Sequence, residues 1–189
     1  MTDADAFDSD AYVSELRAKR QEKDDFFGSH PQSPIPPEDR DDFDGLDYFE
    51  PNPDARVTAR VETHTDPEPV TMDTSADREV RYLRVATFHF DLRDQSLELG
   101  AYRQEHDESP TLFVPFRDKT TGQQTYPGGR YMELTPSGPL SDLDEIVVDF
   151  NLAYNPFCAF SEAFDCPLPP EENWLPVVVQ AGELKYESP

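Results

Sequence analysis

The stretch EVRYLRVATFHFDL, residues 79–92, decides the fold class, because its side chains alternate in type along the chain. A period of two residues is typical of a β-strand, in which successive side chains point to opposite faces of a sheet. One predicted face carries Val80, Tyr82, Arg84, Ala86, Phe88 and Phe90. The other carries Arg81, Leu83, Val85, Thr87 and His89. Valine and aromatic residues are also enriched in strands, so composition and periodicity agree.

Other strand-like segments surround this stretch at short intervals. They are RVTARVE (56–62), VTM (70–72), SLELGAY (96–102), TLFVPF (111–116), QTYPGGRYMEL (124–134), EIVVDFN (145–151) and LPVVVQAG (175–182). Together they predict about eight strands with turn-like gaps, which favours a mainly β fold, an antiparallel β-sandwich or barrel. Regular alternation of strands with helices is missing from the pattern, so a parallel doubly wound sheet is not expected.

The residues before the strands are expected to form a tail, a helix and a connector. Residues 1–9 are predicted to be a disordered acidic tail, and a helix is predicted from Asp10, whose carboxylate suits an N-cap. A proline-rich connector follows and is expected to be ordered by its apolar residues. These anchors are Phe43, Leu46, Tyr48 and Phe49. Residues 10–55 are therefore predicted to pack with a β-rich domain at 56–186 as a single globular unit.

Charge limits the classes of partner that the chain is expected to bind. It has 40 acidic and 16 basic residues, for a net charge of −24. Phosphate backbones and anionic membrane surfaces attract clustered Lys and Arg, so neither nucleic acid nor a membrane is an expected partner. The acidic N-terminus does not read as a signal peptide, and we predict a cytoplasmic location. Aromatic residues make up 12% of the chain, which favours a folded protein with an acidic surface over a disordered one.

Such an acidic surface predicts that stability depends on salt. At molar salt the Debye length falls to about 3 Å, so repulsion among carboxylates is screened. We therefore expect a protein adapted to a salt-rich cytoplasm, as in a halophilic archaeon, that gains structure as KCl rises. Far-UV circular dichroism across a KCl series tests this expectation. Complete folding at low salt with no gain at high salt would contradict it.

The segment LFVPFRDKTTGQQTYPGGRYMEL, residues 112–134, contains the first group of candidate site residues. Arg117 and Arg130 stand out in so acidic a chain, and either guanidinium is suited to a carboxylate or phosphate. Gly128 and Gly129 follow Pro127 and suit a bulge or a close backbone approach. The structural alternative is that Asp118 pairs with an arginine within the fold.

The second group lies around the two cysteines, Cys158 and Cys166, in DFNLAYNPFCAFSEAFDCPLPPEEN, residues 149–173. A disulfide would need an oxidising compartment, although some extremophile cytosols carry them. A zinc site would need four ligands, two of them from histidines that are remote in sequence. A nucleophilic cysteine would need a neighbouring base. We favour two reduced, buried cysteines that pack a rigid loop, because free cysteine is among the most buried residue types. No metal site is predicted.

Three blocks of the chain resemble a known family. They are FRDKTTGQQTYPGGRY (116–131), DFNLAYNPFCAF (149–160) and CPLPPEENWLPV (166–177). They resemble signature segments of a prokaryotic family catalogued as domain of unknown function 1684. SPIPPEDRDDFDGLDYF (33–49) and NPDARV (52–57) are also similar to its N-terminal part, so the resemblance spans about residues 10–186. It implies no particular activity or cofactor, but it suggests that the blocks form one site or one structural junction.

We predict that the protein binds a small anionic metabolite in a pocket at strand ends, lined by Arg, Tyr and Asn. The candidate residues are Arg117, Asp118, Tyr126, Gly128, Gly129, Arg130, Tyr131, Asp149, Asn151, Tyr154, Asn155 and Cys158. One alternative is a non-catalytic structural or protein-interaction module. A second is a hydrolase-like enzyme that uses Cys158, or Asp118 and Asp149 as acid and base.

Overall fold

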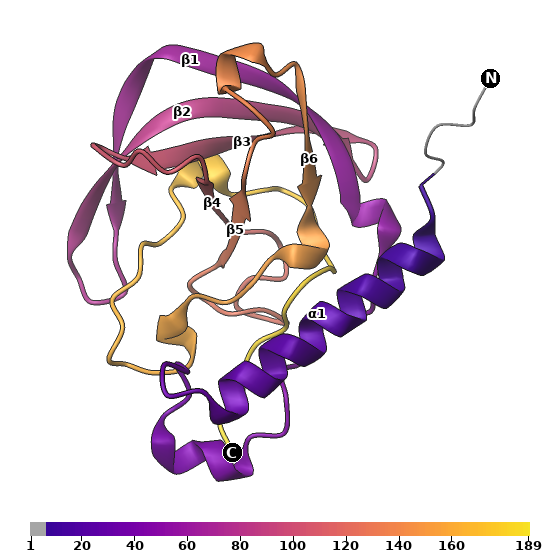
Figure 1. The fold of residues 1–189 in the computed structure, drawn as a ribbon. Helices are drawn as coiled ribbons and strands as arrows, with labels where there is room; N and C mark the ends of the chain where they lie inside the picture. Colours follow the sequence, from indigo (N-terminus) through magenta and orange to yellow (C-terminus); the bar gives the residue numbers. More distant parts are fainter. Residues whose placement is uncertain (1–6) are drawn as a thin grey trace.

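The computed structural model describes residues 7–189, in which one curled six-stranded sheet lies beside a long helix (Figure 1). The strands are β1 (Arg56–Asp73), β2 (Glu79–Leu92), β3 (Gln95–Gln104), β4 (Leu112–Phe116), β5 (Arg130–Leu134) and β6 (Glu145–Asp149). Their order is β5-β4-β3-β2-β1-β6, and every neighbouring pair is antiparallel. The prediction of a mainly β, antiparallel protein with an N-terminal helix is confirmed.

The pairing of β1, β2 and β3 determines which residues enter the core. Val61 of β1 and Leu99 of β3 both pair with Phe88 of β2. Directly paired residues share a face of the sheet, so these side chains point the same way. Phe88 and Leu99 are fully buried, and Phe90, two residues further along β2, is 5% exposed. The predicted alternation therefore holds at Phe88 and Phe90, whereas Val85, Ala86 and Thr87 are all buried next to a register shift between Arg84 and Ala86.

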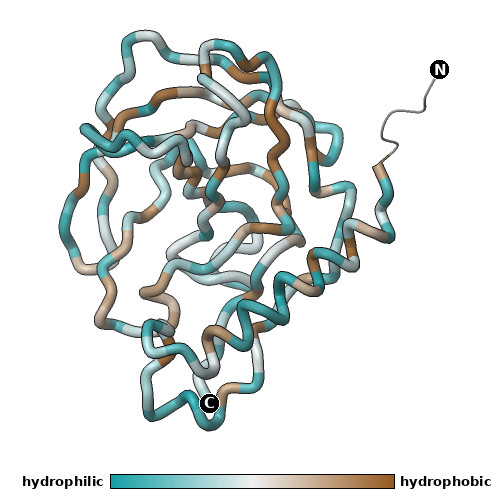
Figure 2. Tube along the Cα trace, in the orientation of Figure 1, coloured by the Kyte–Doolittle hydropathy of each residue, from teal (hydrophilic) through white to brown (hydrophobic). Residues whose placement is uncertain are grey.

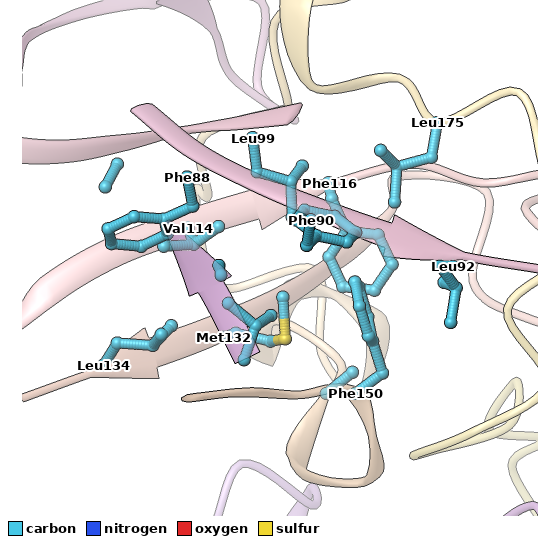
Figure 3. Packing of buried hydrophobic residues seen from close by; sticks show 14 of the residues in the cluster. Phe88, Phe90, Leu92, Leu99, Val114, Phe116, Met132, Leu134, Phe150 and Leu175 are labelled. Carbon is cyan, nitrogen blue, oxygen red and sulfur yellow. The ribbon is translucent and has the colours of Figure 1, made fainter. Parts of the chain in front are cut away.

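The core is continuous across the sheet and reaches the segments that follow it (Figure 3). Its members outside β2 and β3 include Val114, Phe116, Met132, Leu134, Phe150 and Leu175. The Phe116 and Phe150 rings meet edge to face with centroids 5.4 Å apart, a favourable arrangement for aromatic pairs. This contact joins β4 to the segment after β6.

The predicted count of eight strands was wrong, and one of the two differences lies in β1. RVTARVE and VTM belong to this single strand, whose pairing with β2 shifts register between Thr63 and Glu68. An irregularity of this kind adds residues to one strand without ending it. The described chain forms one sheet with β5 and β6 as its edges, so it is a half-barrel and not a sandwich.

The second difference is LPVVVQAG, which is buried but forms no strand in the described structure. Its alternate residues Leu175, Val177, Val179 and Ala181 are buried, which gives the segment the sequence pattern of a strand. Its polar backbone groups are satisfied differently. The Val179 amide donates to the Asp118 carboxylate, and the carbonyl groups of Val179 and Ala181 accept from Arg130. Leu175 and Val177 bond to the backbone of Arg117 and Lys119, and at Val179 and Ala181 two side chains take the place of a neighbouring strand.

Helix α1 (Ser9–Ser29) begins slightly earlier than predicted. Its N-cap is Asp8 and not Asp10, because the Asp8 carboxylate accepts from the backbone amides of Asp10 and Ala11 at 3.1 Å. Residues 1–6 of the predicted tail lie outside the described residues. Most residues of the helix are hydrophilic (Figure 2), and its buried residues are Leu16 and Phe27. In the part of the chain described, no helix is both long and apolar enough to cross a membrane.

The connector packs against the end of α1 in a second, smaller apolar cluster. Ile35 and Leu46 lie there with Phe27 and Phe160, and Phe43 packs against them. Among residues 7–189, the loops contain six 3-10 helices: η1 (Pro37–Asp42), η2 (Pro53–Ala55), η3 (Leu140–Asp142), η4 (Phe150–Leu152), η5 (Phe157–Ala159) and η6 (Glu171–Asn173). Of these, η4 and η5 lie in the loop that follows β6, and this loop packs beside helix α1.

Candidate functional site

Arg130, at the start of β5, is bonded to the protein through both of its terminal nitrogens. Its Nη2 lies 3.5 Å from the Asp118 carboxylate and donates to the Val179 carbonyl at 3.0 Å. Its Nη1 donates to the carbonyl groups of Ala181 and Glu183. The residue is only 1% exposed, and this burial lowers the pKa of its guanidinium while Asp118 opposes the shift. Arg130 therefore holds the C-terminal segment in place.

Asp118 is equally well supplied with donors. Its carboxylate accepts from the Val179 amide at 2.7 Å and from the Thr120 hydroxyl at 2.9 Å. The Thr120 amide donates to it as well, at 3.2 Å. A buried carboxylate needs such donors, because an unpaired charge is costly away from water. The sequence-based alternative, in which Asp118 pairs with an arginine inside the fold, describes this arrangement.

Arg117 and the glycine pair have different surroundings. The Arg117 guanidinium carbon lies 4.6 Å from the centroid of the Trp174 ring, in cation–π geometry. Gly129 has a φ of +88°, and a Cβ there would lie 2.8 Å from the Phe116 carbonyl oxygen. A Cβ on Gly128 would lie 2.5 Å from the Tyr126 ring. The glycine pair thus permits a close approach of chain segments.

The asparagines and Asp149 fix the loop after β6. The Asn151 side chain donates to the Asn52 carbonyl at 2.7 Å and accepts from the Asn52 amide at 2.9 Å. The Asp149 carboxylate accepts from the Tyr12 hydroxyl at 2.5 Å. The Asn155 side chain donates to a backbone carbonyl at residue 184 at 2.9 Å. Asp149 and Asp118 therefore have separate partners, and the structure does not show them as a coupled acid–base pair.

A small cavity lies between helix α1 and the loop after β6, at the exit of that strand. Its volume is about 120 Å³. We call it the helix cavity; it is lined by Leu16, Lys19, Arg20, Lys23, Tyr48, Asn151, Leu152, Ala153, Tyr154 and Glu183. Three cations and one carboxylate thus line this cavity in a chain whose net charge is −24. Asn151 and Tyr154 are the two predicted site residues in its wall.

Arg20 leaves hydrogen-bond donors unused beside this cavity. Its Nη1 donates to the Phe49 carbonyl at 2.9 Å, but its Nε and Nη2 are buried and have no protein partner. The guanidinium carbon lies 4.4 Å from the centroid of the Tyr48 ring, and the Tyr48 hydroxyl is also buried without a partner. Burial lowers the pKa of Arg20, and it raises the pKa of Tyr48, so the Tyr48 hydroxyl stays protonated.

Lys23 neutralises the one carboxylate in the wall. It forms an ion pair with Glu183, whose side chain is 3% exposed, and the second Glu183 oxygen accepts from the Asn155 amide at 3.1 Å. The positive charge of Arg20 therefore has no carboxylate partner of its own among the ion pairs of residues 7–189. The sequence held a signal of this cluster, since RAKRQEK (17–23) concentrates four cations in an acidic chain.

Larger cavities lie elsewhere in the part of the molecule described, and two of them can be compared with the helix cavity. One of about 750 Å³ is bordered by Glu50, Asp54 and Arg93, and its carboxylates make it less suited to an anion. Another, of about 500 Å³, is lined by tyrosines that include the predicted residues Tyr131 and Tyr154. Those two rings meet edge to face with centroids 5.9 Å apart. Neither cavity combines unpartnered buried donors with an excess of cations as the helix cavity does.

The cysteines are free thiols, and the predicted buried packing holds for only one of them. Cys166 is buried, whereas Cys158 is partly exposed. The Tyr126 hydroxyl lies 3.4 Å from the Cys158 sulfur. The structure therefore brings together Tyr126 and Cys158 of the predicted site. Neither residue lines the helix cavity.

Comparison with known proteins supports the family resemblance. The profile described as "Protein of unknown function (DUF1684)" matches residues 41–184. The solution NMR structure of an uncharacterised protein of Haloarcula marismortui is similar, with a TM-score of 0.73 and 64% sequence identity over 93% of this chain and 95% of that one. Its organism fits the predicted halophilic archaeal origin. No curated protein matches. The chain belongs to the DUF1684 family of proteins of unknown function.

Proposed function

We propose that the protein binds a small anion, through a carboxylate or phosphate group, in the helix cavity. The observation that carries this proposal is Arg20, whose Nε and Nη2 are buried beside the cavity without a partner. A buried donor that makes no hydrogen bond costs about 1–3 kcal/mol, so an acceptor there stabilises the protein. The Tyr48 hydroxyl supplies a further unpartnered donor in the same wall.

Charge favours an anion over a neutral occupant. An arginine side chain has donors and no acceptor, and a protonated tyrosine hydroxyl can donate as well. Lys23 and Glu183 offset each other in an ion pair, and Lys19 pairs with Glu15 at an exposed position, so Arg20 supplies the uncompensated positive charge in the wall. Guanidinium groups bind carboxylate and phosphate through paired hydrogen bonds that are stronger than neutral ones. A volume of about 120 Å³ suits a single such group and not a large metabolite in full.

The lining favours binding over catalysis. Both oxygens of Glu183, the one carboxylate in the wall, accept hydrogen bonds from the protein. A general base must reach the proton that it removes. Both Glu183 oxygens already accept hydrogen bonds from Lys23 and Asn155, so this carboxylate is poorly placed to act as a base. The proposed function is therefore recognition of an anionic group. Arg20 would donate the main hydrogen bonds to that group and Tyr48 would donate another, while Asn151 and Tyr154 form part of the cavity wall.

A thermal-shift measurement in molar KCl tests the proposal with inorganic phosphate, sulfate, acetate and a panel of anionic metabolites. A ligand at about 100 times its Kd adds about 2.7 kcal/mol to stability. We expect the stabilisation by an effective anion to disappear in Arg20→Gln. It should persist in Arg17→Gln, which removes the same charge from the same helix at a side chain that is 65% exposed.

A third variant separates lost binding from damage to the fold. Tyr48→Phe keeps the ring beneath Arg20 and removes only the unpartnered hydroxyl. It should fold normally and bind the anion more weakly, by about 1 kcal/mol for a lost hydrogen bond. Equal shifts in the wild type, Arg17→Gln and Arg20→Gln would mean a general salt effect, and the proposal would be abandoned.

A further inference from the structure

Aromatic rings line a cavity on the face of the sheet that is turned away from the core. Its volume is about 500 Å³, and we call it the tyrosine cavity. Five of its lining residues are aromatic: Tyr82, Tyr102, Phe113, Tyr131 and Tyr154. They come from β2, β3, β4, β5 and the loop after β6, so residues that are far apart in the chain build one wall.

Strand pairing explains why these rings gather. Tyr102 of β3 pairs with Phe113 of β4, which in turn pairs with Glu133 of β5. Directly paired residues share a face of the sheet. The alternate residues Leu112 and Leu134 point to the other face and belong to the core. The face away from the core therefore carries aromatic rings with a carboxylate beside them.

Neighbouring rings in this wall stand at steep angles to one another. The Phe113 and Tyr131 centroids lie 4.6 Å apart with the ring planes at 80°, and the Tyr131 and Tyr154 centroids lie 5.9 Å apart with the planes at 89°. Tyr82 lies 5.4 Å from Phe113. Rings at right angles turn their faces in different directions, so a compact group in the cavity can contact more than one face.

Two of the tyrosine hydroxyls are bonded to the protein, which fixes their rings. The Tyr131 hydroxyl donates to the Pro167 carbonyl. The Tyr154 hydroxyl donates to the Glu133 carboxylate at 2.8 Å, and Glu133 itself is exposed. These two tyrosines therefore offer a ligand the surface of a ring more than a hydrogen bond.

The charges of the lining favour a cation. Asp107 and Glu133 contribute carboxylates, and Arg103 is the cationic residue of the lining. Arg103 pairs with Leu83, whose side chain packs against the core, so the Arg103 side chain leaves from the opposite face of the sheet. On the face that carries the rings, the two carboxylates are thus the charged groups of this lining.

Three of the rings have no cation over them in the described chain. Lys23 lies 5.1 Å from the Tyr154 centroid, but no lysine or arginine of residues 7–189 lies over Tyr82, Phe113 or Tyr131. The face of an aromatic ring is negative and attracts cations, and quaternary ammonium groups are recognised in this way. A methylated ammonium also gains by removing its methyl groups from water, whereas K⁺ has no apolar surface to bury.

We propose that the tyrosine cavity binds a small quaternary ammonium compound. Its methylated nitrogen lies against the rings of Tyr82, Phe113 and Tyr131, and the carboxylates of Asp107 and Glu133 balance its charge. Because the rings contribute apolar contact as well as charge attraction, binding persists at the salt concentration that an acidic protein needs.

The test is an NMR titration of the isotope-labelled protein in molar KCl with choline chloride. A parallel titration uses dimethylbutanol, a neutral molecule of the same shape in which carbon replaces the charged nitrogen. We expect saturable shifts of backbone amides in β2, β4 and β5 around the cavity, and choline should bind at least about fivefold more tightly than dimethylbutanol. Equal affinities for the two molecules, or no saturable shift with choline, would overturn the proposal.

Ring variants locate the contact. Phe113→Leu keeps an apolar side chain and should weaken choline about fivefold, whereas Phe113→Tyr keeps the ring and the affinity. The matched control is Trp174→Leu, which removes a 47% exposed ring that Arg117 already covers and should leave the affinity unchanged. Equal effects of Phe113→Leu and Trp174→Leu would also overturn the proposal.

A second ring variant guards against damage to the fold. Far-UV circular dichroism checks each variant, and Tyr82→Leu, on a neighbouring part of the wall, replaces Phe113→Leu if that protein does not fold. It should weaken choline to a similar extent. Neither Tyr82 nor Phe113 lines the helix cavity, so these results are independent of the proposed anion site.

Discussion

Replacing Arg130 by glutamine is expected to lower the free energy of unfolding by about 3–5 kcal/mol. The change removes the partner of the Asp118 carboxylate, which is fully buried, and leaves that charge uncompensated. It also removes the donors to the Val179 and Ala181 carbonyl groups, which have no strand beside them. Since natural domains are stable by about 5–15 kcal/mol, this single change consumes much of the total.

The measurement is urea unfolding in fixed molar KCl, with Arg117→Gln as the matched control. Arg117 lies in the same segment as Arg130, residues 112–134, but its guanidinium stacks on Trp174, which is 47% exposed. An exposed cation–π contact contributes about 0.5–1 kcal/mol, so the control should lose little. Should Arg130→Gln prove no less stable than Arg117→Gln, the role assigned to the buried pair would be incorrect.

Replacing Gly129 by alanine is expected to cost about 2–5 kcal/mol, from backbone strain and steric overlap together. Its φ of +88° is unfavourable for any residue with a Cβ. The added Cβ would also lie 2.7 Å from Pro169 and 2.8 Å from the Phe116 carbonyl oxygen, and a backbone group cannot move aside as a flexible side chain can. Either β4 or the loop at Pro169 must shift.

Gly122→Ala separates the two contributions in the same unfolding experiment. Gly122 has a similar φ of +81°, but a Cβ there would meet nothing within 4 Å. It should therefore cost only the conformational part, about 1–2 kcal/mol. Equal losses for the two variants would show that the close approach at Gly129 contributes nothing.

The sequence predicted the fold class because its main signal is local. Alternation over residues 79–92 follows from the geometry of one strand and needs no knowledge of neighbours. The segment LPVVVQAG has the same alternation but no strand beside it. The backbone groups of Val179 and Ala181 bond to the side chains of Arg130 and Asp118, which are remote in the chain, and a local pattern cannot distinguish these partners from a paired strand.

Part of the wall of the helix cavity was predicted from the sequence, and the anionic ligand stays a prediction. Asn151 and Tyr154 were expected near an anion and line the helix cavity. Arg20 was missed because an arginine on an exposed helix usually has solvent around it. In the structure its guanidinium packs over the Tyr48 ring and bonds to the Phe49 carbonyl, and its Nε and Nη2 are buried.

The most direct test of the proposed anion site is an anomalous difference map from crystals of the protein grown with potassium selenate. We expect a selenium peak in the helix cavity, with selenate oxygens within hydrogen-bond distance of Arg20 Nε and Nη2. The same peak should be missing from crystals of Arg20→Gln grown in the same way. A cavity that holds only water in the wild-type crystals, with those two nitrogens bonded to it, would contradict the central claim.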